Sequence, residues 1–122
     1  MTRRLRCVLP ALLAMGGCDG ESVNTSVVRG GDPERGRAAL ARFECGVCHV
    51  IPGVRGPQAH VGPPLDHFRL RVYLAGKFPN TPEVLVRWLI DPPSLAPETA
   101  MPATGVTEDV ARDMAAYLYG LE

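Results

Sequence analysis

Five residues constrain the fold of this chain more than any other segment: Cys45-Gly46-Val47-Cys48-His49. Two thiols at this spacing lie on one helical turn, and the next residue is an imidazole. The Cys-x-x-Cys-His pattern is the attachment signature of a c-type haem. We therefore expect Cys45 and Cys48 to bind one haem c covalently through its vinyl groups, and His49 to ligate the iron. A chain that carries this large rigid ring must fold around it.

Two other kinds of chemistry are compatible with the motif. A haem with an open sixth coordination position would suit an enzyme or a gas-binding sensor, and a pair of free thiols would suit an oxidoreductase. Thioredoxin-like chemistry needs a βαβ scaffold. No stretch of this sequence alternates between apolar and polar residues for more than a few positions, so we expect almost no sheet. Cys7 and Cys18 precede the motif, which argues against a disulfide framework.

Composition agrees with one small domain built around a prosthetic group. The chain has 122 residues, only 6% of them aromatic, with 13 Gly and 12 Pro. These values predict a loop-rich fold whose core gains volume from a cofactor. Without its first 17 residues the chain has ten basic and 13 acidic residues, a net charge of about −3. No strong basic patch remains, so nucleic acid is not an expected partner.

The amino terminus resembles an export signal. Arg3, Arg4 and Arg6 precede a short apolar stretch at residues 8–15, too short to span a bilayer as a stable helix. Small residues then precede Cys18, as in the lipobox of bacterial lipoproteins. We predict a signal peptide at 1–17, lipidation of Cys18 and a polar tether at 18–31, with a cleaved signal and an incidental cysteine as the alternative. Either predicts export to the periplasmic side of a bacterial membrane.

Three helix starts divide residues 32–122. Each combines a capping residue with an acid in the first turn, at Asp32-Pro33-Glu34, Thr81-Pro82-Glu83 and Thr107-Glu108-Asp109. The first helix is expected to run to about Phe43 and the second to stop before Asp91-Pro92-Pro93.

The last helix carries an apolar stripe of Val110, Met114, Tyr117, Leu118 and Leu121. Residues 50–80 and 91–106 are expected to be loops. Gly36 within the first helix costs about 0.8–1 kcal/mol relative to Ala, so we expect it to contact another helix closely.

Met101 is the expected second axial ligand. It lies in a loop before Pro102, which holds it extended, whereas Met114 lies on the buried stripe. A His/Met ligand pair is usual in electron-transfer haems. His60 and His67 are the competing ligands, but both lie close to His49 in sequence and are expected to be polar loop residues.

The segment Gly62-Pro63-Pro64-Leu65 is a candidate partner for His49. An axial imidazole needs an acceptor on its other nitrogen to fix its orientation, and a proline-rich turn holds a backbone carbonyl rigidly. The alternative interpretation is a tight loop with no such role.

Together, Cys45-x-x-Cys48-His49, Gly62-Pro63-x-Leu65 and Met101-Pro102 resemble the class I cytochromes c over residues 32–121. The resemblance implies an all-α cytochrome c fold, with three or more short helices wrapped around one covalently bound haem. It implies that the first and last helices cross with Gly36 against Tyr117, and that the carbonyl of Pro63 accepts from His49. Residues 80–89 further resemble small bacterial members associated with respiratory oxidases.

The resemblance also implies contacts to the haem propionates, for which Arg71, Tyr73 and Trp88 are the candidates. A solvated Arg, a packed Tyr and a core Trp are the alternatives. The expected function is that of a single-haem electron carrier rather than an enzyme. Its partners would be membrane-associated redox proteins, such as an upstream quinol-oxidising complex and a terminal oxidase, with a lipid anchor on the membrane surface.

Overall fold

The computed structural model describes residues 27–122. The expected signal peptide, Cys7, Cys18 and the first part of the expected tether lie outside the described residues. None of the helices between residues 27 and 122 has the length and apolar character needed to cross a membrane.

Helix α1 (Pro33–Arg42) begins where the sequence predicts. The Asp32 side chain accepts from the backbone N–H of Arg35 at 2.8 Å, and Pro33 occupies the first turn. These features satisfy one free N–H of the first turn and set the backbone for a helix. After Phe43 the chain turns through Glu44, whose φ is +55°, into a 3-10 helix at Cys45–Val47. The cysteine motif is thereby set at the carboxyl end of α1.

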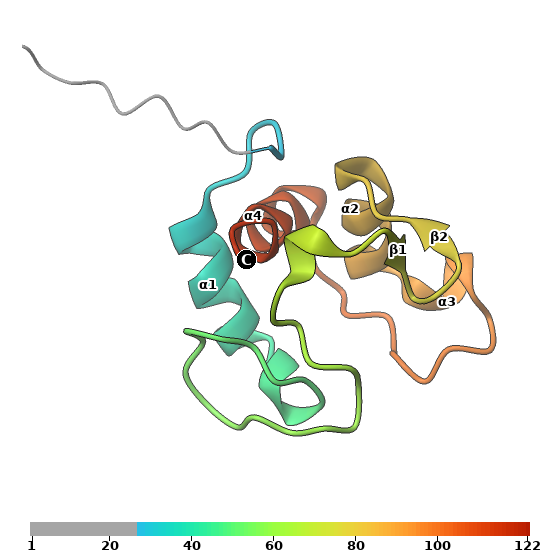
Figure 1. The fold of residues 1–122 in the computed structure, drawn as a ribbon, viewed down its shortest axis with the longest axis horizontal. Helices are drawn as coiled ribbons and strands as arrows, with labels where there is room; N and C mark the ends of the chain where they lie inside the picture. The colour runs from blue at the N-terminus through green and yellow to red at the C-terminus, as the bar shows by residue number, and fades with distance from the viewer. Residues whose placement is uncertain (1–26) are drawn as a thin grey trace, which may run out of the picture.

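Helix α4 (Glu108–Leu118) crosses α1, and these two helices make the most extensive contact between elements (Figure 1). Gly36 lies at the crossing, where a Cβ would overlap with the backbone carbonyl of Asp113. The predicted close contact with another helix is confirmed, since a Cβ at Gly36 would lie nearest to backbone atoms of Asp113 and Met114. Tyr117 lies one turn further along α4, where its hydroxyl donates to the Pro52 carbonyl at 2.6 Å, and its packing against Gly36 stays a prediction.

A charged contact that the sequence did not indicate holds the same crossing. Asp113 on α4 is only 8% exposed. Its carboxylate accepts from Arg35 Nε at 2.8 Å, from Arg35 Nη2 at 2.9 Å and from the Asp32 N–H at 2.8 Å. Burial favours the neutral acid, but these hydrogen bonds and the Arg35 charge outweigh it, so the pKa of Asp113 is lowered.

Helix α2 (Pro82–Ile90) also matches the prediction. The Thr81 hydroxyl caps it, and its apolar face packs on α4. Two expectations about the neighbouring loops were wrong. Pro92–Leu95 forms a short helix, α3, because Pro92 and Pro93 suit a first helical turn. Residues 50–80 contain a 3-10 helix at Phe68–Leu70 and a small antiparallel pair, β1 (Tyr73–Leu74) and β2 (Phe78–Pro79).

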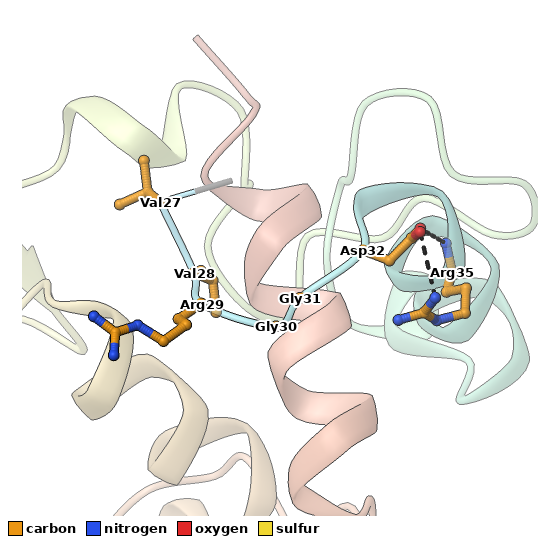
Figure 2. Close-up of a pocket in the computed structure, with 7 residues that line it drawn as sticks. All are labelled: Val27, Val28, Arg29, Gly30, Gly31, Asp32 and Arg35. Carbon is orange, nitrogen blue, oxygen red and sulfur yellow. Dashed lines mark hydrogen bonds and ion pairs between the residues drawn. The ribbon is translucent and has the colours of Figure 1, made fainter. Parts of the chain in front are cut away.

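The folded domain begins before residue 32. We expected residues 27–31 to belong to a tether, but Val28 is only 1% exposed and joins the core. At Gly31 a Cβ would overlap with the Arg112 carbonyl of α4. Figure 2 shows this segment running beside α4 to Asp32 and Arg35, where it lines a surface pocket. Burial of apolar surface fixes this segment against the domain.

The core lies among α1, α2 and α4. Met114 is 2% exposed, which confirms its role as a core residue, and Leu118 is buried with it. Val110, Tyr117 and Leu121 are partly buried against the same cluster, as the predicted stripe requires. Ala111 and Ala115 are fully buried. Such small residues allow α4 to approach its neighbours closely.

Candidate haem site

The two cysteines lie on one tight turn that follows α1 after Glu44. The backbone N–H groups of Cys48 and His49 both donate to the Cys45 carbonyl, at 3.2 and 3.0 Å. Cys45 and Cys48 are partly buried and neither forms a disulfide. Gly46 between them is buried, and a Cβ there would overlap with the Pro57 carbonyl. The motif is therefore a tightly wound turn that presents two free thiols and an imidazole.

His49 has a defined ring orientation. Its Nδ1 lies 2.7 Å from the backbone carbonyl oxygen of Pro63. A carbonyl oxygen can only accept, so Nδ1 carries the proton and donates. In the neutral ring Nε2 is then unprotonated and can bind a metal. This is the contact that the resemblance implied for His49 and Pro63.

Gly62 explains how the proline turn comes so close to this ring. A Cβ at Gly62 would lie 2.7 Å from His49 Nδ1 and would overlap with Cε1. The Gly62 N–H also donates to the Cys48 carbonyl at 2.7 Å. The position thus requires the one residue without a side chain, because any Cβ would displace the imidazole from Pro63.

The loop between the cysteine motif and Pro63 is held by its own hydrogen bonds. Leu65 N–H donates to the Val50 carbonyl at 2.8 Å, and Ala59 N–H donates to the Gly46 carbonyl at 3.0 Å. The Gln58 amide accepts from the Ile51 N–H and donates to the Val54 carbonyl at 3.0 Å. Gln58 could not be recognised in the sequence, because nothing local marks a glutamine that bridges two backbone groups of a loop.

Met101 is partly buried and packs against the core cluster. Its N–H donates to the Thr99 hydroxyl at 3.2 Å. His60 and His67, the competing ligands, are exposed. The Nε2 atom of His67 lies 3.9 Å from the Asp66 carboxylate. Of the three candidates, Met101 alone has a side chain turned partly into the domain, and its role as an iron ligand stays a prediction.

The three candidate propionate contacts lie in different environments. Arg71 donates to the backbone carbonyls of Pro64 and Asp66, the latter at 3.0 Å, which fastens the loop next to Pro63. Tyr73 is 62% exposed. Trp88 is buried on α2, with its ring centroid 6.2 Å from that of Phe78. Their part in binding propionates stays a prediction.

The surroundings of Cys45 disfavour a reactive thiolate. Burial raises the pKa of Cys45 above its usual value. A nucleophilic thiol of an oxidoreductase instead needs a lowered pKa, because the thiolate is the reactive form. Within residues 27–122 the strand pair β1 and β2 belongs to no βαβ unit. Within the same residues, no group of three His, Cys, Asp or Glu side chains is arranged to hold a metal ion by itself.

The arrangement fits a covalently bound haem. Cys45 and Cys48 supply the two thiols, and the hydrogen bond to Pro63 leaves Nε2 of His49 available for iron. The Met101 thioether is a soft donor of the kind that completes such a ligand set.

Comparisons with known proteins find a likeness among solved structures. No family model matches the chain, and no curated protein matches it. Among solved structures it is similar to cytochrome c2 from Rhodobacter sphaeroides, at 21% sequence identity and a TM-score of 0.52. The match covers 75% of this chain and 96% of the cytochrome c2 chain. The chain therefore has the fold of the class I c-type cytochromes.

Proposed function

We propose that the protein is a single-haem electron carrier that uses haem c. The observation that carries this proposal is the hydrogen bond of His49 Nδ1 to Pro63 O, which leaves Nε2 as a metal ligand directly beside two free thiols. Thioether bonds from Cys45 and Cys48 would hold the group permanently. The similarity to a cytochrome c2 supports the same function.

Each candidate residue of the site has a separate proposed role. His49 Nε2 and the Met101 thioether would bind the iron, with His49 oriented by its hydrogen bond to Pro63. Haem iron supplies a one-electron couple when bound. Two protein ligands leave no position for a substrate or a gas, so the protein would tune the potential rather than make bonds. Arg71, Tyr73 and Trp88 would contact the propionates or the polar edge of the site.

An open sixth position is the competing proposal, and it predicts a haem enzyme or a sensor. The partly buried Met101, fixed by the hydroxyl of Thr99, favours the closed site over this alternative. Thiol–disulfide chemistry is disfavoured by the raised pKa of Cys45 and by the absence of a βαβ unit within residues 27–122.

The partners would be other redox proteins. Residues 80–89 and the lipobox-like sequence favour membrane-associated partners, such as a quinol-oxidising complex upstream and a terminal oxidase downstream. Lipidation of Cys18 would hold the domain on the periplasmic side of a bacterial membrane. Because Val28 already belongs to the folded domain, only residues 19–27 separate it from Cys18. Nine extended residues reach at most about 30 Å, which would keep the carrier close to the membrane.

The test is the visible spectrum of the full chain matured in a bacterial periplasm, recorded in both oxidation states. We expect one covalently bound haem, a low-spin spectrum in both states, a methionine–iron charge-transfer band in the oxidised state and no binding of carbon monoxide. A high-spin reduced spectrum that binds carbon monoxide would favour the enzyme or sensor. Protein in which both thiols can be alkylated would contradict haem attachment.

The lipid anchor is tested separately. Mass spectrometry of the mature amino terminus should find a lipidated Cys18, and Cys18→Ser should move the protein from the membrane to the soluble periplasmic fraction. An unmodified amine at Cys18, or a soluble wild-type protein, would reject the anchor and leave the electron-carrier proposal intact.

A further inference from the structure

The carboxyl end of α2 lacks two of its usual hydrogen-bond donors. In a continuing helix the N–H groups of residues 92 and 93 would donate to the carbonyls of Trp88 and Leu89. Both residues are prolines, which have no N–H. The Arg87 carbonyl is satisfied by the N–H of Asp91 at 3.1 Å. The carbonyls of Trp88 and Leu89 are therefore open to donors from water or from another part of the chain.

Thr104 supplies such a donor to Leu89. Its hydroxyl donates to the Leu89 carbonyl at 2.6 Å, across 15 residues of sequence. The same hydroxyl oxygen is the acceptor for the Val106 N–H at 3.4 Å. Thr104 is partly buried, so water competes less for this hydrogen bond than at an open surface. One side chain thus joins the loop after α3 to the end of α2.

The hydrogen bond from Thr104 to Leu89 anchors one end of the segment that carries Met101. On the amino-terminal side, Thr99 N–H donates to the Ala96 carbonyl at 3.0 Å, and the Thr99 hydroxyl accepts from Met101 N–H. On the carboxyl-terminal side, Thr104 lies three residues beyond Met101. An ion pair between Lys77 and Glu98 also reaches this loop, but both side chains are more than half exposed. Exposed pairs contribute little, so Thr104 is the stronger tie.

We propose that Thr104 is a positioning residue for Met101. It would hold the loop in the conformation in which the Met101 thioether can bind the haem iron. The inference rests on the proposed function, in which Met101 is an iron ligand. Thr104 does not touch the iron. It acts by disfavouring the loop conformations in which Met101 has moved away, and its loss raises the population of those conformations.

The experiment measures the affinity of the oxidised full-length protein for added imidazole. The apparent affinity equals the intrinsic affinity multiplied by the fraction of protein whose sixth position is free. Three variants are compared with the wild type. T104V keeps the side-chain shape without the hydroxyl, and T104S keeps the hydroxyl. T107V is the matched control, because Thr107 is exposed and its side chain makes no capping hydrogen bond.

The expected result is an affinity for imidazole about three- to tenfold higher in T104V, from the net value of one partly buried hydrogen bond. T104S and T107V should match the wild type, and the methionine–iron band should weaken in T104V alone. An unchanged affinity in T104V, even with a lower thermal midpoint, would overturn the proposal and leave Thr104 a structural residue. Equal increases in T104V and T104S would also overturn it.

A fourth variant separates this proposal from the one on which it depends. M101A should bind imidazole far more tightly than any threonine variant. If M101A and the wild type bind imidazole equally, Met101 is not a ligand, and the assignment of Met101 fails together with the role of Thr104. If M101A binds imidazole more tightly and T104V does not, the assignment of Met101 as a ligand is retained and the role of Thr104 alone is rejected.

Discussion

Gly36 on α1 and Asp113 on α4 bring two helix backbones into direct contact, because a Cβ at Gly36 would overlap with the Asp113 carbonyl. The residue before Gly36, Arg35, adds two hydrogen bonds to the Asp113 carboxylate. Steric fit and charge therefore act on the same turn of each helix. This crossing fixes the direction of α1, and the cysteine motif follows at the end of that helix.

Gly36→Ala tests the steric part of the crossing, and the sign of its effect is diagnostic. Helix propensity alone would stabilise α1 by about 0.8–1 kcal/mol. Overpacking against a helix backbone should instead dominate and lower the free energy of unfolding by about 1–3 kcal/mol. Urea unfolding of the holoprotein measures the difference. A stabilised variant would contradict the close contact.

The charged part of the crossing is expected to depend on pH. The lowered pKa of Asp113 means that its contribution is fully present above the usual value of 3.8 and is lost as the pH falls through the folded-state pKa. Asp113→Asn should therefore cost about 2 kcal/mol at pH 7. This cost should shrink as the pH falls below 3.8 and through the lower folded-state pKa, because the wild type itself then loses the contribution.

Urea unfolding at pH 7 and at a series of pH values below 3.8 provides the measurement. Glu44→Gln is the control for removal of a carboxylate, since Glu44 is exposed and lies outside the crossing. A loss for Asp113→Asn that stays the same at every pH would show that the charge of Asp113 does not stabilise the crossing.

Gly62→Ala should disturb His49 specifically. The added methyl would occupy the space of the imidazole and push it away from the Pro63 carbonyl. We expect less covalently bound haem per protein and a partly high-spin oxidised spectrum. Haem content by pyridine haemochrome and the visible spectrum measure both effects. Val61→Ala, at an adjacent side chain that is 78% exposed, should leave them unchanged. A normal spectrum in Gly62→Ala would contradict the close approach.

Met101→Ala should open the sixth coordination position and lower the reduction potential, by something on the order of 0.1 V within the range that axial ligands span. Spectroelectrochemistry and cyanide binding are the measurements. Met114→Leu is the control, because Met114 is a buried core residue and should affect stability without changing the spectrum. If Met101→Ala kept its potential and excluded cyanide, Met101 would not be the ligand.

Elements whose causes lie in adjacent residues could be predicted from the sequence. The starts of α1, α2 and α4 were recognised because a capping side chain, a proline or an acid acts on backbone groups within one turn. The proline-rich turn at residues 62–65 was a candidate partner of His49 because such a turn holds a backbone carbonyl rigidly, and the resemblance specified Pro63 within it. Helix α3 was missed, because paired prolines were interpreted only as a stop signal.

Long-range contacts could not be predicted in this way. Nothing in the local sequence pairs Asp113 with Arg35 across 78 residues, or Thr104 with Leu89. An aspartate on an amphipathic helix is ordinarily expected on its solvated face. Val28 likewise belonged to a polar, glycine-ended stretch, and only burial against the core places it in the domain.

The sequence by itself determined which functional groups are available and on which segments they lie. These are two thiols and an imidazole on one turn, a proline-rich turn and a loop methionine. Covalent spacing and helix caps act over a few residues, so they can be recognised in the primary structure. The tertiary structure decided how these groups are held. It brought Gly62 against the ring of His49 and Gly36 against α4, and it tied the Met101 loop to α2 through Thr104. Such contacts depend on how separate segments pack, and packing exists only once the chain has folded.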